Sequence, residues 1–196
     1  MKNTLLVIVL SVVLAGCGVN VKRTVKDNIL VSNASPAIRL NIPQPYELVN
    51  STSGKKFNEY DNGFSGSYDN ENSYLFLKKS ANGYVDGAFY VAFVEAGAQT
   101  MFIDELKDKE LFNSGNMQFR GFNYKTYFKV GKLPRSSENS CFIQKMHRKV
   151  LPPNKSRLFV MVYSEVISCD KLNTEYSRSQ VISEVDARAF EFMNSL

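Results

Sequence analysis

Few side chains in this sequence could carry out chemistry, because the chain has one histidine, His147, and three cysteines. A Ser-His-Asp or Cys-His arrangement would have to use that imidazole. His147 falls in the middle of a predicted strand, and Cys141, six residues earlier on the same strand, would lie about 20 Å away if the strand is extended. No Gly-x-Ser-x-Gly turn occurs. We therefore expect His147 to be a partly exposed sheet residue beside Tyr163, and we predict no catalytic residue.

Ligands for metals and phosphates are equally scarce. A zinc site draws on several His or Cys ligands, and this chain has a single imidazole. Asp61, Asp69 and Glu71 lack the Asp-x-Asp-x-Asp-Gly spacing of a calcium loop. The glycine-rich phosphate-binding loop of nucleotide-binding proteins is also missing from the sequence. We expect no metal and no cofactor.

Paired carboxylates are the one catalytic set that the sequence leaves open. The local cluster of four acids is best explained as the solvated face of a helix with ion pairs three or four residues apart; it consists of Asp104, Glu105, Asp108 and Glu110. A glycosidase needs two carboxylates about 5–10 Å apart in a cleft. The order of residues cannot reveal such a pair, so a carboxylate-based hydrolase remains the alternative to a non-enzymatic protein.

The first 16 residues have the zones of an export signal. Lys2 precedes an apolar run over 5–14 that only Ser11 interrupts, and Leu14-Ala15-Gly16-Cys17 closes the segment. About ten apolar residues form a helix of roughly 15 Å, half the hydrocarbon thickness of a bilayer, which favours a cleaved signal over a transmembrane helix. The closing motif resembles the lipobox of bacterial lipoproteins. The resemblance implies thioether lipidation of Cys17, cleavage before it, and acylation of the new amine.

Lipidation of Cys17 would attach the protein to a membrane of the cell envelope, because several acyl chains anchor a protein stably. An ordinary secretory signal with a chance cysteine is the alternative. Gly18 stands where, by the rule of that family, an aspartate would favour retention in the inner membrane. The expected location is therefore the outer membrane, on its periplasmic or surface face, if the source is Gram-negative.

The remaining cysteines and the charges limit the other properties. Cys141 and Cys169 form an even pair in an oxidising compartment, which predicts a disulfide, with two buried free thiols as the alternative. The net charge of +5 comes from scattered lysines and arginines. A nucleic-acid-binding protein concentrates its basic residues on one face or helix. We therefore expect no nucleic-acid partner.

Composition and periodicity divide the chain into a signal peptide over 1–16, a lipidated tether over 17–35 and one globular domain over 36–196. Strand patterns occur at 37–42, 74–78, 88–95, 120–130, 140–150 and 157–168. A helix is predicted over 99–112, where Met101 or Phe102, Leu106 and Leu111 are spaced for one face. A longer amphipathic helix follows Asn173, which can cap it, and its apolar stripe consists of Val181, Val185, Ala189, Phe192 and Leu196.

The cysteine pair suggests a register for the last two strands. If Cys141 lies opposite Cys169, Lys145 faces Glu165, His147 faces Tyr163 and Val150 faces Val160. An opposite-charge pair in this ladder favours the proposed hairpin.

Residues 50–72 are rich in Ser, Gly, Asn, Asp and Lys and predict a long loop. Four aromatic residues in this loop could close over a ligand; they are Phe57, Tyr60, Phe64 and Tyr68. The alternative is that they only hold the loop to the domain surface.

These elements predict an α+β domain, a mostly antiparallel sheet with a mid-chain helix and a C-terminal amphipathic helix. The element order is similar to that of PsbP/Mog1-like domains of some envelope lipoproteins, which implies a sheet flanked by helices. We expect a membrane-anchored envelope lipoprotein whose domain binds another envelope protein or a small ligand without catalysis. The alternatives are a carboxylate-based hydrolase acting on envelope glycans and a role in immunity or exclusion at the cell surface.

Overall fold

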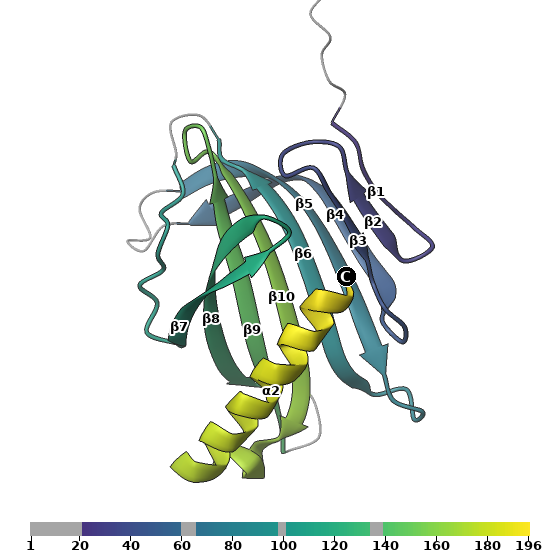
Figure 1. Cartoon of the computed structure of the whole chain (residues 1–196), viewed down its shortest axis with the longest axis vertical. Helices are drawn as coiled ribbons and strands as arrows, with labels where there is room; N and C mark the ends of the chain where they lie inside the picture. The colour runs from purple at the N-terminus through teal and green to yellow at the C-terminus, as the bar shows by residue number, and fades with distance from the viewer. Residues whose placement is uncertain (1–20, 60–65, 98–100, 134–138) are drawn as a thin grey trace, which may run out of the picture.

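The computed structural model describes residues 21–59, 66–97, 101–133 and 139–196 (Figure 1). Within these residues a seven-stranded antiparallel sheet forms the body of the molecule. In sheet order its strands are β4 (Glu47–Glu59), β5 (Gly66–Lys79), β6 (Val85–Glu95), β10 (Arg157–Ser168), β9 (Ser140–Leu151), β8 (Phe122–Lys132) and β7 (Leu111–Phe119). A 3-10 turn, η1 (Cys169–Leu172), leads into the C-terminal helix α2 (Glu175–Ser195). The predicted antiparallel sheet and C-terminal helix are confirmed.

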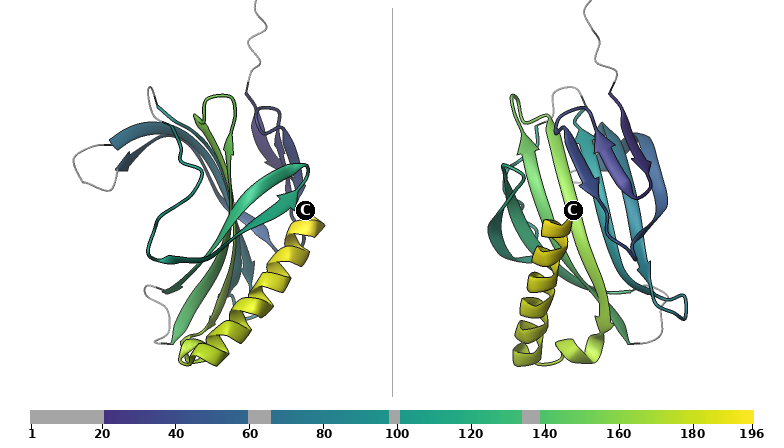
Figure 2. Two further views of the ribbon diagram at one scale, coloured as in Figure 1. Left: turned by 60° about the vertical axis from the view of Figure 1, so that its left-hand side comes forward. Right: turned by 45° about the vertical axis from the view of Figure 1, so that its right-hand side comes forward.

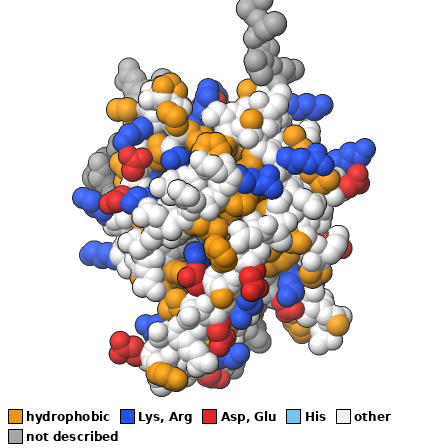
Figure 3. Space-filling model, in the orientation of Figure 1, with side chains coloured by type: hydrophobic (Ala, Val, Ile, Leu, Met, Phe, Trp, Pro, Cys, Tyr) orange, Lys and Arg blue, Asp and Glu red, His pale blue; other side chains and the backbone are white. Residues whose placement is uncertain are grey.

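Helix α2 covers one face of this sheet (Figure 2). Its buried stripe follows the predicted helical spacing and consists of Val181, Val185, Ala189, Phe192 and Met193. The Phe192 ring lies 4.8 Å from that of Phe89 on β6 and 5.1 Å from that of Tyr163 on β10, measured between ring centroids. Apolar side chains are visible along the border between α2 and the strands (Figure 3). Removing this apolar stripe from water is what holds the helix against the sheet.

Thr174 caps the N-terminus of helix α2, in place of the predicted Asn173. The Thr174 hydroxyl accepts a hydrogen bond from the Ser177 amide at 3.1 Å, and the Ser177 hydroxyl lies within reach of the Thr174 amide. This capping box pairs backbone donors that the first turn of a helix leaves without partners. At the other end, the Asn41 amide donates to the carbonyl of Leu196 at 2.8 Å.

The folded part begins earlier than the composition predicts. Residues 23–32, which the sequence assigns to the tether, form β1 (Arg23–Lys26) and β2 (Ile29–Ser32). These pair with β3 (Ile38–Asn41) in a second, three-stranded antiparallel sheet beside the C-terminal end of α2. Leu30 and Leu40 are fully buried there and join the main core.

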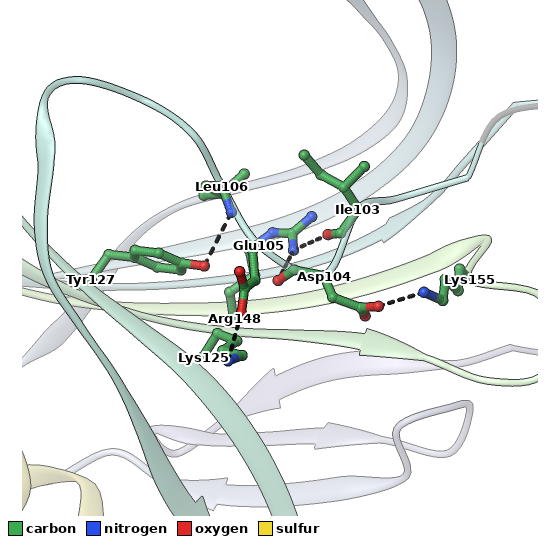
Figure 4. A network of polar contacts seen from close by, with 8 residues as sticks. All are labelled: Ile103, Asp104, Glu105, Leu106, Lys125, Tyr127, Arg148 and Lys155. Atoms are coloured by element: carbon green, nitrogen blue, oxygen red, sulfur yellow. Dashed lines mark hydrogen bonds and ion pairs between the residues drawn. The ribbon is translucent and has the colours of Figure 1, made fainter.

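The predicted mid-chain helix is wrong, because the described residues 101–110 form no helix. Side chains of the sheet bind the backbone groups that a helix would have paired internally (Figure 4). The Tyr127 hydroxyl accepts a hydrogen bond from the Leu106 amide at 3.1 Å. The Arg148 guanidinium donates to the carbonyls of Ile103 and Asp104. These partners lie far away in the sequence, so local spacing could not reveal them.

The predicted long loop over 50–72 is also wrong, because β4 and β5 form a hairpin there. Their pairing continues out to Glu59 and Gly66. Most of β4 from Asn50 to Phe57 is exposed. An exposed strand buries neither of its faces, so this part of β4 lacks the apolar–polar alternation by which strands are recognised.

The predicted disulfide between Cys141 and Cys169 is present, but the predicted register is wrong by two residues. Lys145 lies opposite Tyr163, His147 opposite Met161, and Val150 opposite Leu158. Cys169 lies beyond the end of β10, in η1, so the disulfide does not join directly opposed strand residues. A shift of two keeps every side chain on its predicted face, because side chains alternate with a period of two.

Candidate functional site

A groove of about 900 Å³ lies between the β7–β8 hairpin and the N-terminal half of α2. Its volume falls in the range of about 300–1,000 Å³ that is typical of ligand pockets. Strands β7, β8 and β9 supply one wall, and residues 175–186 of the helix supply the other. Three other cavities among the described residues are smaller, with volumes of about 440, 210 and 30 Å³.

The apolar part of the groove consists of Phe112, Phe128, Val130 and Ile182. The rings of Phe112 and Phe128 stack with centroids 5.9 Å apart and an interplanar angle of 26°. Phe128 is buried, whereas Phe112 and Ile182 are partly exposed. These side chains offer a ligand an apolar surface that is already held in place by the core.

The buried charge of the groove is Lys145, whose ammonium group forms an ion pair with Asp186. The Lys145 side chain is 10% exposed and that of Asp186 is 49% exposed. Burial lowers the pKa of Lys145 from its usual value, because a desolvated ammonium group is less stable. The Lys145 ammonium also lies 5.5 Å from the centroid of the Phe128 ring. The wall of the groove therefore places the Lys145 ammonium group beside the aromatic ring of Phe128.

The rim of the groove is polar and comes from β7 and α2. Asn113 and Asn116 lie on the strand, and Arg178, Ser179 and Glu175 lie on the first turns of the helix. All five are exposed. Such a rim supplies hydrogen-bond donors and acceptors around an apolar floor, which is the usual composition of a binding pocket.

Strand β7 is an edge strand, and an irregularity in its pairing shapes the groove. The pairing with β8 shifts between Phe112 and Gly115, and Asn113 has a φ of 48°. A β-bulge of this kind turns side chains toward new directions, and Asn113 lines the groove together with its neighbour Phe112. Gly115 lies close to β8, since an added Cβ would stand 3.1 Å from Oγ1 of Thr126.

His147 lies next to this wall, and the prediction of a partly exposed histidine beside Tyr163 is wrong. Its side chain is fully buried, with Thr126 on one side and Met161 on the other in the ladder. Among the described residues neither ring nitrogen has a hydrogen-bond partner. Desolvation, with a smaller contribution from the Lys145 charge, lowers the pKa of His147 from 6.5 to about 3. The imidazole is therefore neutral at physiological pH.

Two of the four predicted aromatic residues, Phe57 and Tyr68, lie toward the opposite edge of the sheet from the groove. Phe57 and Tyr68 face each other across β4 and β5, with centroids 5.1 Å apart, and are 52% and 64% exposed. Tyr60 and Phe64 lie outside the described residues. Strand β4 forms one edge of the sheet and β7 the other. The predicted binding residues and the groove are thus two separate features.

Sequence reasoning missed the groove, although two signals pointed to it. Lys145 shares the core-facing parity of Cys141 and Ile143 on β9, which places a charge where an apolar residue is expected. Asp186 follows Ile182 by four residues and therefore shares its side of the helix. A lysine and an aspartate, each directed toward a core from a different element, suggest a buried ion pair.

The acids of the groove do not form a glycosidase pair. Glu175 and Asp186 are eleven residues apart on α2, which separates them by about 16 Å along the helix. That exceeds the separation of about 5–10 Å that glycoside hydrolysis requires, and Asp186 is already paired with Lys145.

Across the described parts of the chain, no cluster of three or more His, Cys, Asp or Glu residues could hold a metal ion. In the same residues, no helix has the length and apolar composition needed to cross a bilayer.

Comparison with known proteins finds no matching family model, no matching curated protein and no matching solved structure.

Proposed function

We propose that this protein is a lipid-anchored protein of the bacterial cell envelope whose folded domain binds a ligand in the groove between the β7–β8 hairpin and α2. Binding, rather than catalysis, is the role of the groove. The anchor is the acylated Cys17, and the membrane is the outer membrane if the source is Gram-negative. The groove is the observation that carries the proposal, since its volume and its mixed lining suit a ligand.

The lining favours an amphipathic ligand. An apolar portion would pack against Phe112 and Ile182, where partly exposed carbon surface already lies beside the buried Phe128. Polar groups of the ligand would face the Asn113 and Arg178 side chains at the rim. The ion pair between Lys145 and Asp186 leaves the interior nearly neutral, so strong selection for either sign of charge is not expected.

The proposal of a non-enzymatic role is supported by the separation of the groove acids and by the buried, neutral His147. A general base must reach its substrate within hydrogen-bond distance, and a fully buried imidazole that does not line the groove cannot do so. The carboxylate-based hydrolase therefore has no specific observation in its favour.

Site-specific photo-crosslinking in the native host tests the groove. A photoreactive phenylalanine analogue at Ser179, which lines the groove, should capture an envelope component covalently. The matched control is the same analogue at Ala187, eight residues later, exposed on α2 and outside the groove. Capture at 179 and not at 187 is the expected result. Equal capture at both positions, or none at either, would remove the groove from the proposal.

A competition experiment then separates binding from accidental proximity. Ser179→Trp should fill part of the groove and weaken binding of the captured component, whereas Ala187→Trp should leave binding unchanged. Both changes place the same bulky side chain on an exposed position of one helix. Isothermal titration with the purified component measures the difference. Equal affinities of the two variants would contradict the proposed site.

The anchor is tested separately through Cys17. Mass spectrometry of the protein from its native host should show residues 1–16 removed and fatty acyl chains on Cys17. Cys17→Ser should move the protein from the membrane fraction to the soluble fraction, because several acyl chains are needed for stable anchoring. A wild-type protein with an intact initiator methionine and no fatty acid would disprove the anchored location.

A further inference from the structure

We infer that the domain docks directly onto the bilayer surface through the end from which its N-terminus leaves, with Tyr68, Phe57, Met101 and Ile103 contacting the lipid interface. We call these four residues, together with Lys22 and Lys155, the anchor-proximal surface. This inference rests on the proposed lipidation of Cys17 and goes beyond it, because lipidation alone does not orient a domain.

Only a short length of chain separates the proposed lipidation site from the folded part of the protein. Lys22 already belongs to the folded part, since its amide donates to Oδ1 of Asn33 at 2.7 Å, and β1 starts at the next residue. Cys17 and Lys22 are five residues apart. In any conformation five residues span at most about 18 Å. A tether over 17–35 would have allowed the domain to stand far from the membrane, whereas this one holds it within about 18 Å of the lipid.

Contacts between distant segments place the other residues at the same end of the molecule. The Arg23 guanidinium lies 4.5 Å from the centroid of the Phe93 ring, and Arg23, Glu95 and Arg157 line one small cavity. Figure 1 shows β1 starting at the upper end of the molecule, the end at which the turn between β9 and β10 also lies. The amide of Ala96 donates to the carbonyl of Ser156 in that turn at 2.7 Å.

The segment that carries Met101 and Ile103 joins the same end. The amide of Phe102 donates to the carbonyl of Lys155 at 2.8 Å, and the Lys155 ammonium pairs with Asp104 (Figure 4). On the other side, the Gly97 amide donates to Oδ1 of Asp69 at 3.0 Å, next to Tyr68. Contacts made through the turn between β9 and β10 therefore place the start of β1 and the four hydrophobic residues at the same end of the molecule.

The four hydrophobic side chains of the anchor-proximal surface are largely exposed to solvent. Met101 is 68% exposed, Tyr68 64%, Ile103 59% and Phe57 52%. Apolar side chains that lie near one another and face solvent mark an interaction site. Tyrosine, with an apolar ring and a polar tip, suits the level of the lipid headgroups. A surface held within reach of a bilayer by its own anchor has that bilayer as its nearest partner.

The charges at this end fit a headgroup layer. Lys155 pairs with Asp104, and Arg157 pairs with Glu95 at 3.1 Å, so the acids there are matched by bases. Lys22 and Lys55 add exposed positive charge. Anionic lipids attract basic residues that lie near the membrane surface. Charge therefore favours the same orientation as the hydrophobic residues.

Tryptophan fluorescence in vesicles tests the inference, because the natural chain contains no tryptophan. The lipidated full chain, purified from its host as Tyr68→Trp or Met101→Trp, is reconstituted into phosphatidylglycerol–phosphatidylethanolamine vesicles with or without brominated acyl chains. We expect a blue-shifted emission and a loss of fluorescence with the brominated lipid. The matched control is Tyr84→Trp, which is 76% exposed in the native protein and immediately precedes β6. Strand β6 runs from Val85 to Glu95, so position 84 lies about 33 Å from the docked end and should not be quenched.

The outcomes separate the docking from the anchor. Vesicle flotation and mass spectrometry report the anchor, and quenching reports the docking. Protein that floats with the vesicles but shows no quenching at position 68 or 101, or equal quenching at position 84, overturns the docking while the anchor stands. Protein that neither floats nor carries fatty acid overturns both. Circular dichroism of each variant confirms that the fold is unchanged.

Discussion

Lys145 of β9 and Asp186 of α2 form an ion pair across the interface between the sheet and the helix, at the wall of the groove. Lys145 is almost fully buried, and its ammonium group also faces the Phe128 ring. The ion pair therefore lies between the hydrophobic core and the candidate binding site.

Breaking this pair from the acid side should destabilise the protein more than removing the lysine. Asp186→Asn leaves a buried ammonium group without its counter-ion and should lower the free energy of unfolding by about 1–2 kcal/mol, since the exposed side of Asp186 moderates the effect. Lys145→Met removes the charge with similar volume and should cost less than about 1 kcal/mol. Urea denaturation of both single variants and the double variant measures the coupling. A larger loss of unfolding free energy in Lys145→Met than in Asp186→Asn would contradict this prediction. It would show that the attraction within the ion pair outweighs the cost of burying the lysine.

His147 should make the fold sensitive to acid. Burial lowers the pKa of His147 from 6.5 to about 3, so the folded state favours the neutral imidazole. Below pH 6.5 the unfolded chain takes up a proton that the folded chain does not, and stability contributed by His147 falls as the pH decreases toward 3. The loss should reach about 2 kcal/mol between pH 7 and pH 5.

The variant His147→Leu isolates this effect. It should lose about 2 kcal/mol less than the wild type between pH 7 and pH 5. At pH 7 it should be at least as stable as the wild type, because two buried nitrogens without partners are removed. Urea denaturation at the two pH values gives both numbers. Parallel losses in wild type and variant would assign the acid sensitivity to other groups.

The disulfide between Cys141 and Cys169 should account for a large part of the stability. It spans 28 positions in the sequence and joins the start of β9 to η1, just before α2. In the chain-entropy model, closing such a loop stabilises the folded state by roughly 3–4 kcal/mol. Cys141→Ser combined with Cys169→Ser, or reduction with dithiothreitol, should lower the urea midpoint accordingly. An unchanged midpoint after verified reduction would contradict this estimate.

The cap of α2 offers a smaller, local test. Thr174→Ala removes the hydroxyl that accepts a hydrogen bond from the Ser177 amide and should cost about 1 kcal/mol. Gln180→Ala, at an exposed position six residues later on the same helix, is the control and should change stability by less than about 0.5 kcal/mol. Thermal denaturation followed by circular dichroism compares them. Equal shifts in the two variants would mean that the cap contributes nothing.

Local patterns correctly predicted the elements whose faces are buried. Residues 140–150 and 157–168 alternate because one face of β9 and β10 packs beneath α2, and the helix shows its stripe because that stripe meets the sheet. The pairing of Cys141 with Cys169 was predicted from their even number and from the expected oxidising compartment. For the strands and the helix, burial of one apolar face produces a periodic pattern in the sequence.

The remaining features depend on contacts between residues far apart in the chain, and only the tertiary structure decided them. Residues 101–110 have helical spacing, but Arg148 and Tyr127 of the sheet bind three of their backbone groups, and no helix forms. Strand β4 is exposed from Asn50 to Phe57 in the β4–β5 hairpin, so no buried face marks that part of the strand. The groove is lined by side chains from separate elements, among them Lys145 and Asp186, which are 41 residues apart in the sequence. A sequence records which residues avoid water, but it does not record which distant partner each of them meets.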